Sequence, residues 1–86
     1  MKVHLGQSLR DYDWIMITDD MTFYWSRDTS EINYDKFDPT VGHVSKTIQE
    51  WVNNCTTNGI KYLGYFDTDE YPSIDAYKKD YPEFFI

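Results

Sequence analysis

The chain has 86 residues, of which 15 are Asp or Glu and eight are Lys or Arg, so its formal net charge is −7 at pH 7. This length suits a single domain, residues 1–86, and the negative charge argues against direct binding to nucleic acid or to an anionic membrane, because both attract cationic surfaces. One cysteine excludes an internal disulfide, and no apolar run approaches the roughly 18 residues of a membrane span.

Aromatic residues make up 19% of the chain. A small domain buries a low fraction of its surface, and large rings let few side chains fill its core. The eight tyrosines exceed that need, and tyrosine is common in binding surfaces. The N-terminal segment lacks the continuous apolar core of a signal peptide, so we expect a cytoplasmic protein.

The first predicted elements are strands. Polar and apolar residues alternate over residues 2–5, which predicts a short edge strand that ends at Gly6. Residues 13–18 are apolar on both faces, and residues 21–26 alternate. Because the two-residue acidic break at 19–20 separates these two runs, the pattern predicts a β-hairpin. Asp-Asp is a weaker turn signal than Asn-Gly, which leaves open a two-residue turn or a longer or bulged one.

Residues 27–38 are polar and charged, and we expect a structured loop there. Asp38 suits a helix N-cap and Pro39 the first helical position, so they predict the start of a helix over residues 40–57. Gly59 is a suitable stop because glycine readily adopts the left-handed conformation that ends helices. The apolar stripe of this helix comprises Val41, Val44, Ile48, Trp51, Val52 and Cys55.

Residues 60–66 are apolar and aromatic and predict a further strand. A short second helix is predicted from Ile74 to Asp80, because Ser73 can cap its start and Pro82 stops it. An apolar tail follows. The order predicts an α+β domain in which an antiparallel or mixed sheet of three or four strands packs against one long helix, which leaves the other sheet face partly free.

No pattern of residues predicts catalysis, a metal or a cofactor. Cys55 falls on the apolar stripe of the predicted helix, where a small buried side chain is expected. His4 and His43 lack metal-ligand spacing. The acidic stretch at residues 67–75 fails as a calcium loop, since Tyr71 and Pro72 stand where an oxygen ligand and a glycine are required. We therefore expect a protein that is not an enzyme.

The acidic residues cluster in predicted turns and loops. Carboxylates favour such places for local reasons, because they hydrogen-bond nearby backbone and suit helix N-termini. If the hairpin turn and the loop at 67–70 lie at one end of the sheet, however, several carboxylates converge there. Such a row resembles the phosphates of a nucleic acid, whose charges repeat every few ångströms. Tyr24 lies on the apparently polar face of its strand, and Tyr34 and Tyr71 lie in or beside loops. With these tyrosines, the predicted partner-binding residues are Asp19, Asp20, Asp28, Glu31, Asp67, Asp69, Glu70, Tyr24, Tyr34 and Tyr71.

These features favour a protein-binding inhibitor that docks to a basic protein, such as a nuclease or another nucleic-acid-handling protein. In size, charge and aromatic content, but not in any motif, the chain is similar to the small acidic inhibitors that phages and plasmids encode. That similarity implies nucleic-acid mimicry and an anti-CRISPR-like or other anti-defence role in the host cytoplasm. The alternative is a structural or assembly subunit that acts as a homo-oligomer such as a homodimer, with the tail Phe84-Phe85-Ile86 and the free sheet face as its interface.

Overall fold

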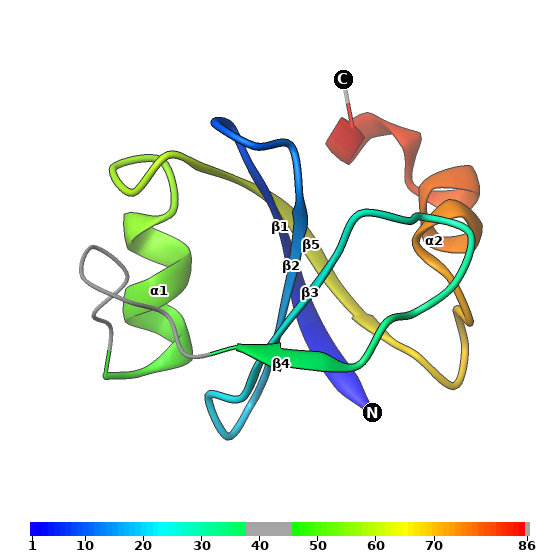
Figure 1. Ribbon diagram of the computed structural model, residues 1–86, viewed down its shortest axis with the longest axis horizontal. Helices are drawn as coiled ribbons and strands as arrows, with labels where there is room; N and C mark the ends of the chain where they lie inside the picture. Colours follow the sequence, from blue (N-terminus) through cyan, green and yellow to red (C-terminus); the bar gives the residue numbers. More distant parts are fainter. Residues whose placement is uncertain (38–45, 86) are drawn as a thin grey trace.

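The protein is an α+β structure built on one antiparallel sheet of five strands (Figure 1). The computed structural model describes residues 1–37 and 46–85. The strands are β1 (Lys2–Ser8), β2 (Trp14–Thr18), β3 (Phe23–Ser26), β4 (Asp35–Phe37) and β5 (Ile60–Asp67), in the spatial order β4-β3-β2-β1-β5. The helices are α1 (Ile48–Asn54), α2 (Ile74–Asp80) and a short 3₁₀ helix, η1 (Pro82–Phe85). None of the helices in the described ranges has the length and apolar character needed to cross a membrane.

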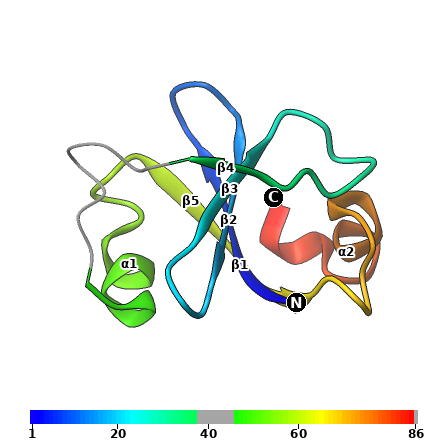
Figure 2. The same cartoon turned by 60° about the horizontal axis from the view of Figure 1, so that its bottom comes forward.

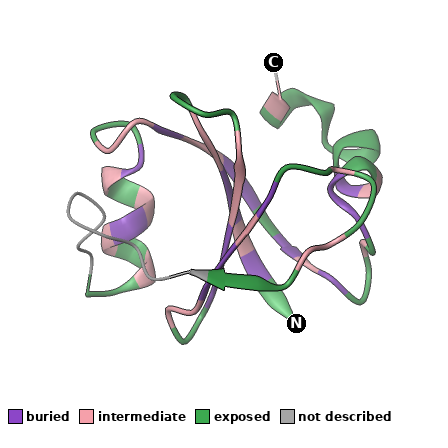
Figure 3. Ribbon diagram, viewed as in Figure 1, coloured by how far each residue is buried: buried purple, intermediate pink, exposed green. Residues whose placement is uncertain are grey.

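Helices cover both faces of the sheet. Figures 1 and 2 show α1 on one side of the strands and α2 with η1 on the other. The core is accordingly divided into two clusters of buried side chains, and the sheet lies between them (Figure 3). The cluster under α1 contains Ile17, Phe23, Trp51, Cys55 and Ile60. The cluster under α2 contains Val3, Leu5, Met16, Tyr24, Leu63, Phe66, Ile74 and Tyr77. The expectation of a partly free sheet face was wrong, because α2 and the tail occupy it.

The predicted β-hairpin is confirmed as β2 and β3. Its turn is longer than two residues, since four residues separate the strands. Thr18 donates its hydroxyl hydrogen to the Asp20 carboxylate, and the same hydroxyl oxygen accepts from the Thr22 N–H. Met21 takes a left-handed backbone conformation, with φ of 66°, which closes the turn.

The strand at the N-terminus differs from the prediction in length and in position. β1 continues through Gly6 to Ser8, and it lies between β2 and β5 instead of at an edge. Its register with β5 shifts between Leu5 and Gly6, opposite Leu63, and this extra residue forms a β-bulge. Glycine at position 6 reflects close packing instead of a strand end: a Cβ there would lie 2.7 Å from Ile60 Cγ2 and 3.1 Å from Trp51 Cη2.

The sheet has one strand more than the upper limit of the prediction. β4 lies within the segment 27–38, which was expected to be entirely loop, and pairs with β3. Three polar and aromatic residues, Asp35–Phe37, carry too little alternation to predict a strand. The pairing partner provided by β3 is what makes this segment a strand.

The prediction of one long helix over 40–57 was wrong. Residues 38–45, with Asp38, Pro39, Val41 and Val44, lie outside the described residues. α1 begins at Ile48, and Thr47 before it has an extended backbone, so the helix does not extend back through it. Thr47 is the N-cap: its hydroxyl accepts from the Glu50 N–H at 3.1 Å, and Glu50 Oε2 accepts from the Lys46 N–H at 3.2 Å. This closely resembles a capping box, which the spacing Thr47-x-x-Glu50 indicates in the sequence.

The C-terminal elements follow the prediction. β5 spans the expected strand with one more residue, and α2 has the expected bounds. The Ser73 hydroxyl caps α2 by accepting from the Ala76 N–H at 3.0 Å. The tail forms η1, and Phe85 packs against the cluster under α2.

We expect Gly6→Ala to lower the free energy of unfolding by about 1–3 kcal/mol, because the new methyl group would overpack the contact between α1 and the sheet. Urea denaturation measures this change. Gly59→Ala is the matched control: apart from the adjoining residues, no described atom lies within 4 Å of its Cβ position, so its cost comes from the left-handed backbone, with φ of 74°. We expect the NMR resonance of the Trp51 indole to shift in Gly6→Ala and to stay unchanged in Gly59→Ala. A Gly6→Ala variant with unchanged stability would contradict the close packing.

Candidate functional site

The sheet topology brings the hairpin turn and the loop after β5 to the same end of the sheet. Thr18, the last residue of β2, pairs with Val3, and Asp67, the last residue of β5, pairs with Lys2. Both strands therefore end beside the start of β1, and Figure 1 shows their turns on the side of the N-terminus. We call this region the acidic end; its carboxylates are Asp19, Asp20, Asp67, Asp69 and Glu70.

Two of these carboxylates have structural roles. Asp20 accepts from the Thr18 hydroxyl and from the Thr22 N–H at 3.1 Å, and these hydrogen bonds lower its pKa. Asp67 accepts from the Asp69 N–H at 3.0 Å and lies 3.2 Å from the amino group of Met1. The same contacts lower the pKa of Asp67. Both side chains stabilise turns.

The other three carboxylates point toward solvent. The side chains of Asp19 and Asp69 are 66% and 90% exposed, and Glu70 is exposed. Asp69 lies 3.5 Å from the Met1 amino group. In residues 1–37 and 46–85, no cationic side chain lies within ion-pair distance of Glu70. These groups are available to a basic partner.

Asp28 and Glu31 lie in the loop between β3 and β4. This loop leaves the sheet opposite Trp14, at the end away from the hairpin turn. Asp28 accepts from the Ser30 N–H at 2.8 Å and from the Ser30 hydroxyl at 2.7 Å, which lowers its pKa. The loop then lies against the start of α2, where the Thr29 carbonyl accepts from the Asp75 N–H at 2.9 Å. Strand pairing therefore does not bring these two residues to the acidic end.

The three predicted tyrosines differ in exposure. Tyr24 is only 9% exposed and belongs to the core cluster under α2. Tyr34 is 54% exposed and meets the Tyr24 ring edge-on, with ring centroids 5.8 Å apart. Tyr71 is half-buried and packs edge-on against Tyr77. Of the three, Tyr34 presents the most surface.

A cluster around His4 was missed by the sequence analysis. His4 Nδ1 lies 2.9 Å from the Tyr62 hydroxyl, and its ring centroid is 4.5 Å from that of Tyr65. Its Nε2 lies 3.9 Å from Asp19 Oδ1. Burial lowers the pKa of His4, and the negative charge of Asp19 opposes this shift. The cluster depends on β1 pairing with β5, which are 58 positions apart at His4 and Tyr62, and no local signal predicts that pairing.

Cys55 is buried, and its thiol donates to the Trp51 carbonyl at 3.2 Å. Burial raises the pKa of this thiol to about 12, so it is protonated near neutral pH and a poor nucleophile. Within the described ranges, no group of three or more His, Cys, Asp or Glu side chains could hold a metal ion. His43 lies outside those ranges.

Comparisons of the chain with protein-family models, with curated proteins and with solved structures found no match.

The lowered pKa of His4 predicts how stability depends on pH. In the unfolded chain His4 takes up a proton near pH 6.5, whereas the folded protein resists protonation until a lower pH. The free energy of unfolding should therefore fall as the pH drops from about 6.5 through the folded pKa. Urea denaturation between pH 5 and pH 8 measures this, and His4→Gln should lack this component. A titration of the His4 imidazole by NMR with a midpoint above 6.5 would contradict the prediction.

Proposed function

We propose that the protein is a small acidic inhibitor that docks to a cationic surface of a larger, nucleic-acid-handling protein and competes with nucleic acid there. One observation carries the proposal: antiparallel pairing brings the hairpin turn and the 67–70 loop, with three solvent-exposed carboxylates, to one end of the sheet. The buried thiol of Cys55 needs no oxidising compartment, which supports action in the cytoplasm.

The charges of the acidic end would act mainly on association. Clustered carboxylates attract a basic surface over about one Debye length, roughly 8–10 Å at physiological salt, and so raise the rate of encounter. Groups fixed in turns keep their relative positions, as Asp20 and Asp67 do through their hydrogen bonds. Exposed carboxylates carried on such fixed turns would therefore compete with the phosphates that a nucleic-acid-binding groove accepts.

Exposed aromatic side chains would supply much of the affinity. Tyr34 is 54% exposed and Tyr65 is 43% exposed. Tyrosine is enriched among the residues that contribute most to binding energy, because its ring covers a large area and its hydroxyl stays hydrogen-bonded. Tyr65 lies on β5 beside His4, close to the acidic end.

The homo-oligomer has less support. Its interface was expected on a free sheet face and on the apolar tail, but α2 and η1 cover that face. Phe85 packs against the core cluster, and Phe84 is 39% exposed. Ile86 lies outside the described residues, and within them little of the expected interface is left for a second copy.

Reversing the charge of the acidic end should slow binding to a basic partner. We expect Asp69→Lys with Glu70→Lys to lower the association rate constant about tenfold or more at low salt, because the steering charge is lost. The partner is first captured from a lysate on the tagged protein. We then measure whether duplex DNA or RNA competes with the protein for binding to that partner. Stopped-flow or surface plasmon resonance over a range of salt concentrations gives the rate.

The matched control is Asp11→Lys with Glu83→Lys. This variant has the same net charge, but both changes lie away from the acidic end, in the β1–β2 loop and in η1. It should bind faster than the first variant, and both should fold. Equal slowing of the two variants would show that only net charge matters, and an association rate that ignores salt would refute the steering mechanism.

A further inference from the structure

Three segments meet at the imidazole of His4. β1 provides His4 itself, the hairpin turn provides Asp19, and β5 provides Tyr62 and Tyr65. His4 Nδ1 is 2.9 Å from the Tyr62 hydroxyl, a hydrogen-bond distance. The separation of 3.9 Å between His4 Nε2 and Asp19 Oδ1 is too long for a hydrogen bond. The Asp19 carboxylate is therefore close to the imidazole but accepts no hydrogen bond from it.

Asp19 is the one carboxylate of the acidic end that lies beside exposed aromatic surface and has no hydrogen bond from a described residue. Asp20 and Asp67 both accept hydrogen bonds within their turns. The side chain of Asp19 is 66% exposed, and Tyr65, whose ring is tilted by 47° against that of His4, is 43% exposed. The side chain of His4 between them is 15% exposed.

The other groups around the imidazole add little positive charge. From α1, the neighbour of Tyr62 is the uncharged indole of Trp51, with ring centroids 6.2 Å apart. Lys2 lies two residues before His4 on β1, and its charge acts on its strand partner Asp67, whose pKa it helps to lower. The neighbours named here therefore leave the charge of Asp19 unneutralised while His4 is neutral.

We propose that Asp19, His4 and Tyr65 form a docking site for one arginine side chain of the protein partner. This inference rests on the proposed function and specifies that the partner presents an arginine side chain at its surface. A guanidinium group is planar, so it can stack on the exposed ring of Tyr65, next to the edge of His4, while it donates hydrogen bonds to the Asp19 carboxylate. A lysine ammonium can pair with Asp19 but does not stack in this way, and so fits less well.

The same geometry makes the site sensitive to pH. When His4 is neutral, Asp19 is free to pair with the arginine. When His4 is protonated, its positive charge lies next to Asp19 and repels the guanidinium. Binding of arginine is therefore strongest above the pKa of His4 and weakens as the pH falls through it.

The test is an NMR titration of the whole isotope-labelled protein with N-acetyl-arginine amide as the probe. We expect saturable shifts of the His4 imidazole and Tyr65 ring resonances at pH 7.5, reduced at pH 5. N-acetyl-lysine amide should bind about two- to fivefold more weakly. The uncharged N-acetyl-citrulline amide should produce no saturable shift.

Asp19→Asn should abolish the shifts, whereas Asp11→Asn, which removes the same charge from the exposed loop between β1 and β2, should retain them. Asp19→Asn should also lower the pKa of His4, because it removes the negative charge that favours the protonated imidazole. This change in pKa shows that the substitution acts at the imidazole. Equal effects of both variants, or shifts spread over all carboxylates, would overturn the proposal. So would shifts that depend on protein concentration without the probe, since these indicate a second copy as the occupant. The two proposals can fail separately. If the arginine probe binds at this site but the lysate capture finds no basic partner protein, the proposed function is wrong and the arginine site still stands.

Discussion

The pairing of β1 with β2 on one side and β5 on the other is the constraint on which the rest of the structure depends. It joins the first residues of the chain to residues more than 50 positions later. It also places α1 and α2, which flank β5 in the sequence, on opposite faces of the sheet. The close approach at Gly6 belongs to this arrangement, because Trp51 of α1 and Ile60 of β5 both pack where a side chain at position 6 would lie.

The elements that the sequence predicts well are those with local signals. Alternation around an acidic turn predicts the hairpin, and a serine cap with a following proline predicts α2. The errors concern partners that are distant along the chain. Residues 2–5 look like an edge strand until β5 is known to pair with them, and Asp35–Phe37 looks like loop until β3 pairs with it. The start of α1 is an exception, since Thr47 and Glu50 carry a local signal that the stronger Asp-Pro pattern concealed.

The candidate site shows the same division. Acidic residues in turns can be read from the sequence, and the condition for their convergence can be stated. Whether two turns share an end follows only from strand order. Exposure is also beyond sequence reasoning: Tyr24 alternates with apolar neighbours as a surface residue would, yet it is buried because helices cover both faces. His4 gains its neighbours from three separate segments, so nothing near it in the chain indicates them.

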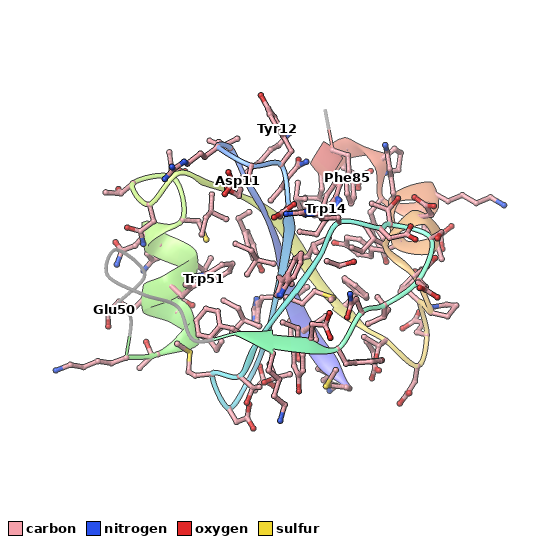
Figure 4. All side chains as sticks on the ribbon, in the orientation of Figure 1. Asp11, Tyr12, Trp14, Glu50, Trp51 and Phe85 are labelled. Carbon is pink, nitrogen blue, oxygen red and sulfur yellow. The ribbon has the colours of Figure 1, made fainter. Side chains whose placement is uncertain are left out.

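The carboxylates have a structural role, and the partner binding that we propose for them is compatible with it. Asp20, Asp28 and Asp67 close turns by accepting backbone or hydroxyl hydrogens, and these bonds hold the loops in one conformation. Fixed loops then present Asp19, Asp69 and Glu70 at defined positions with little further loss of freedom on binding. Figure 4 shows Trp51 between α1 and the sheet, and Trp14 beside Phe85, so aromatic side chains pack on both faces.

The bulge in β5 has a consequence for how the molecule behaves at high concentration. β5 is an eight-residue strand at the edge of the sheet, the kind of strand on which other chains can add and begin fibrils. At Leu63 and Gly64 the strand is interrupted by the bulge, Gly64 has a φ of 103°, and the Tyr77 hydroxyl donates to the Leu63 carbonyl at 3.0 Å. An incoming strand would therefore lose regular pairing in the middle of β5, which disfavours edge-to-edge addition of further chains.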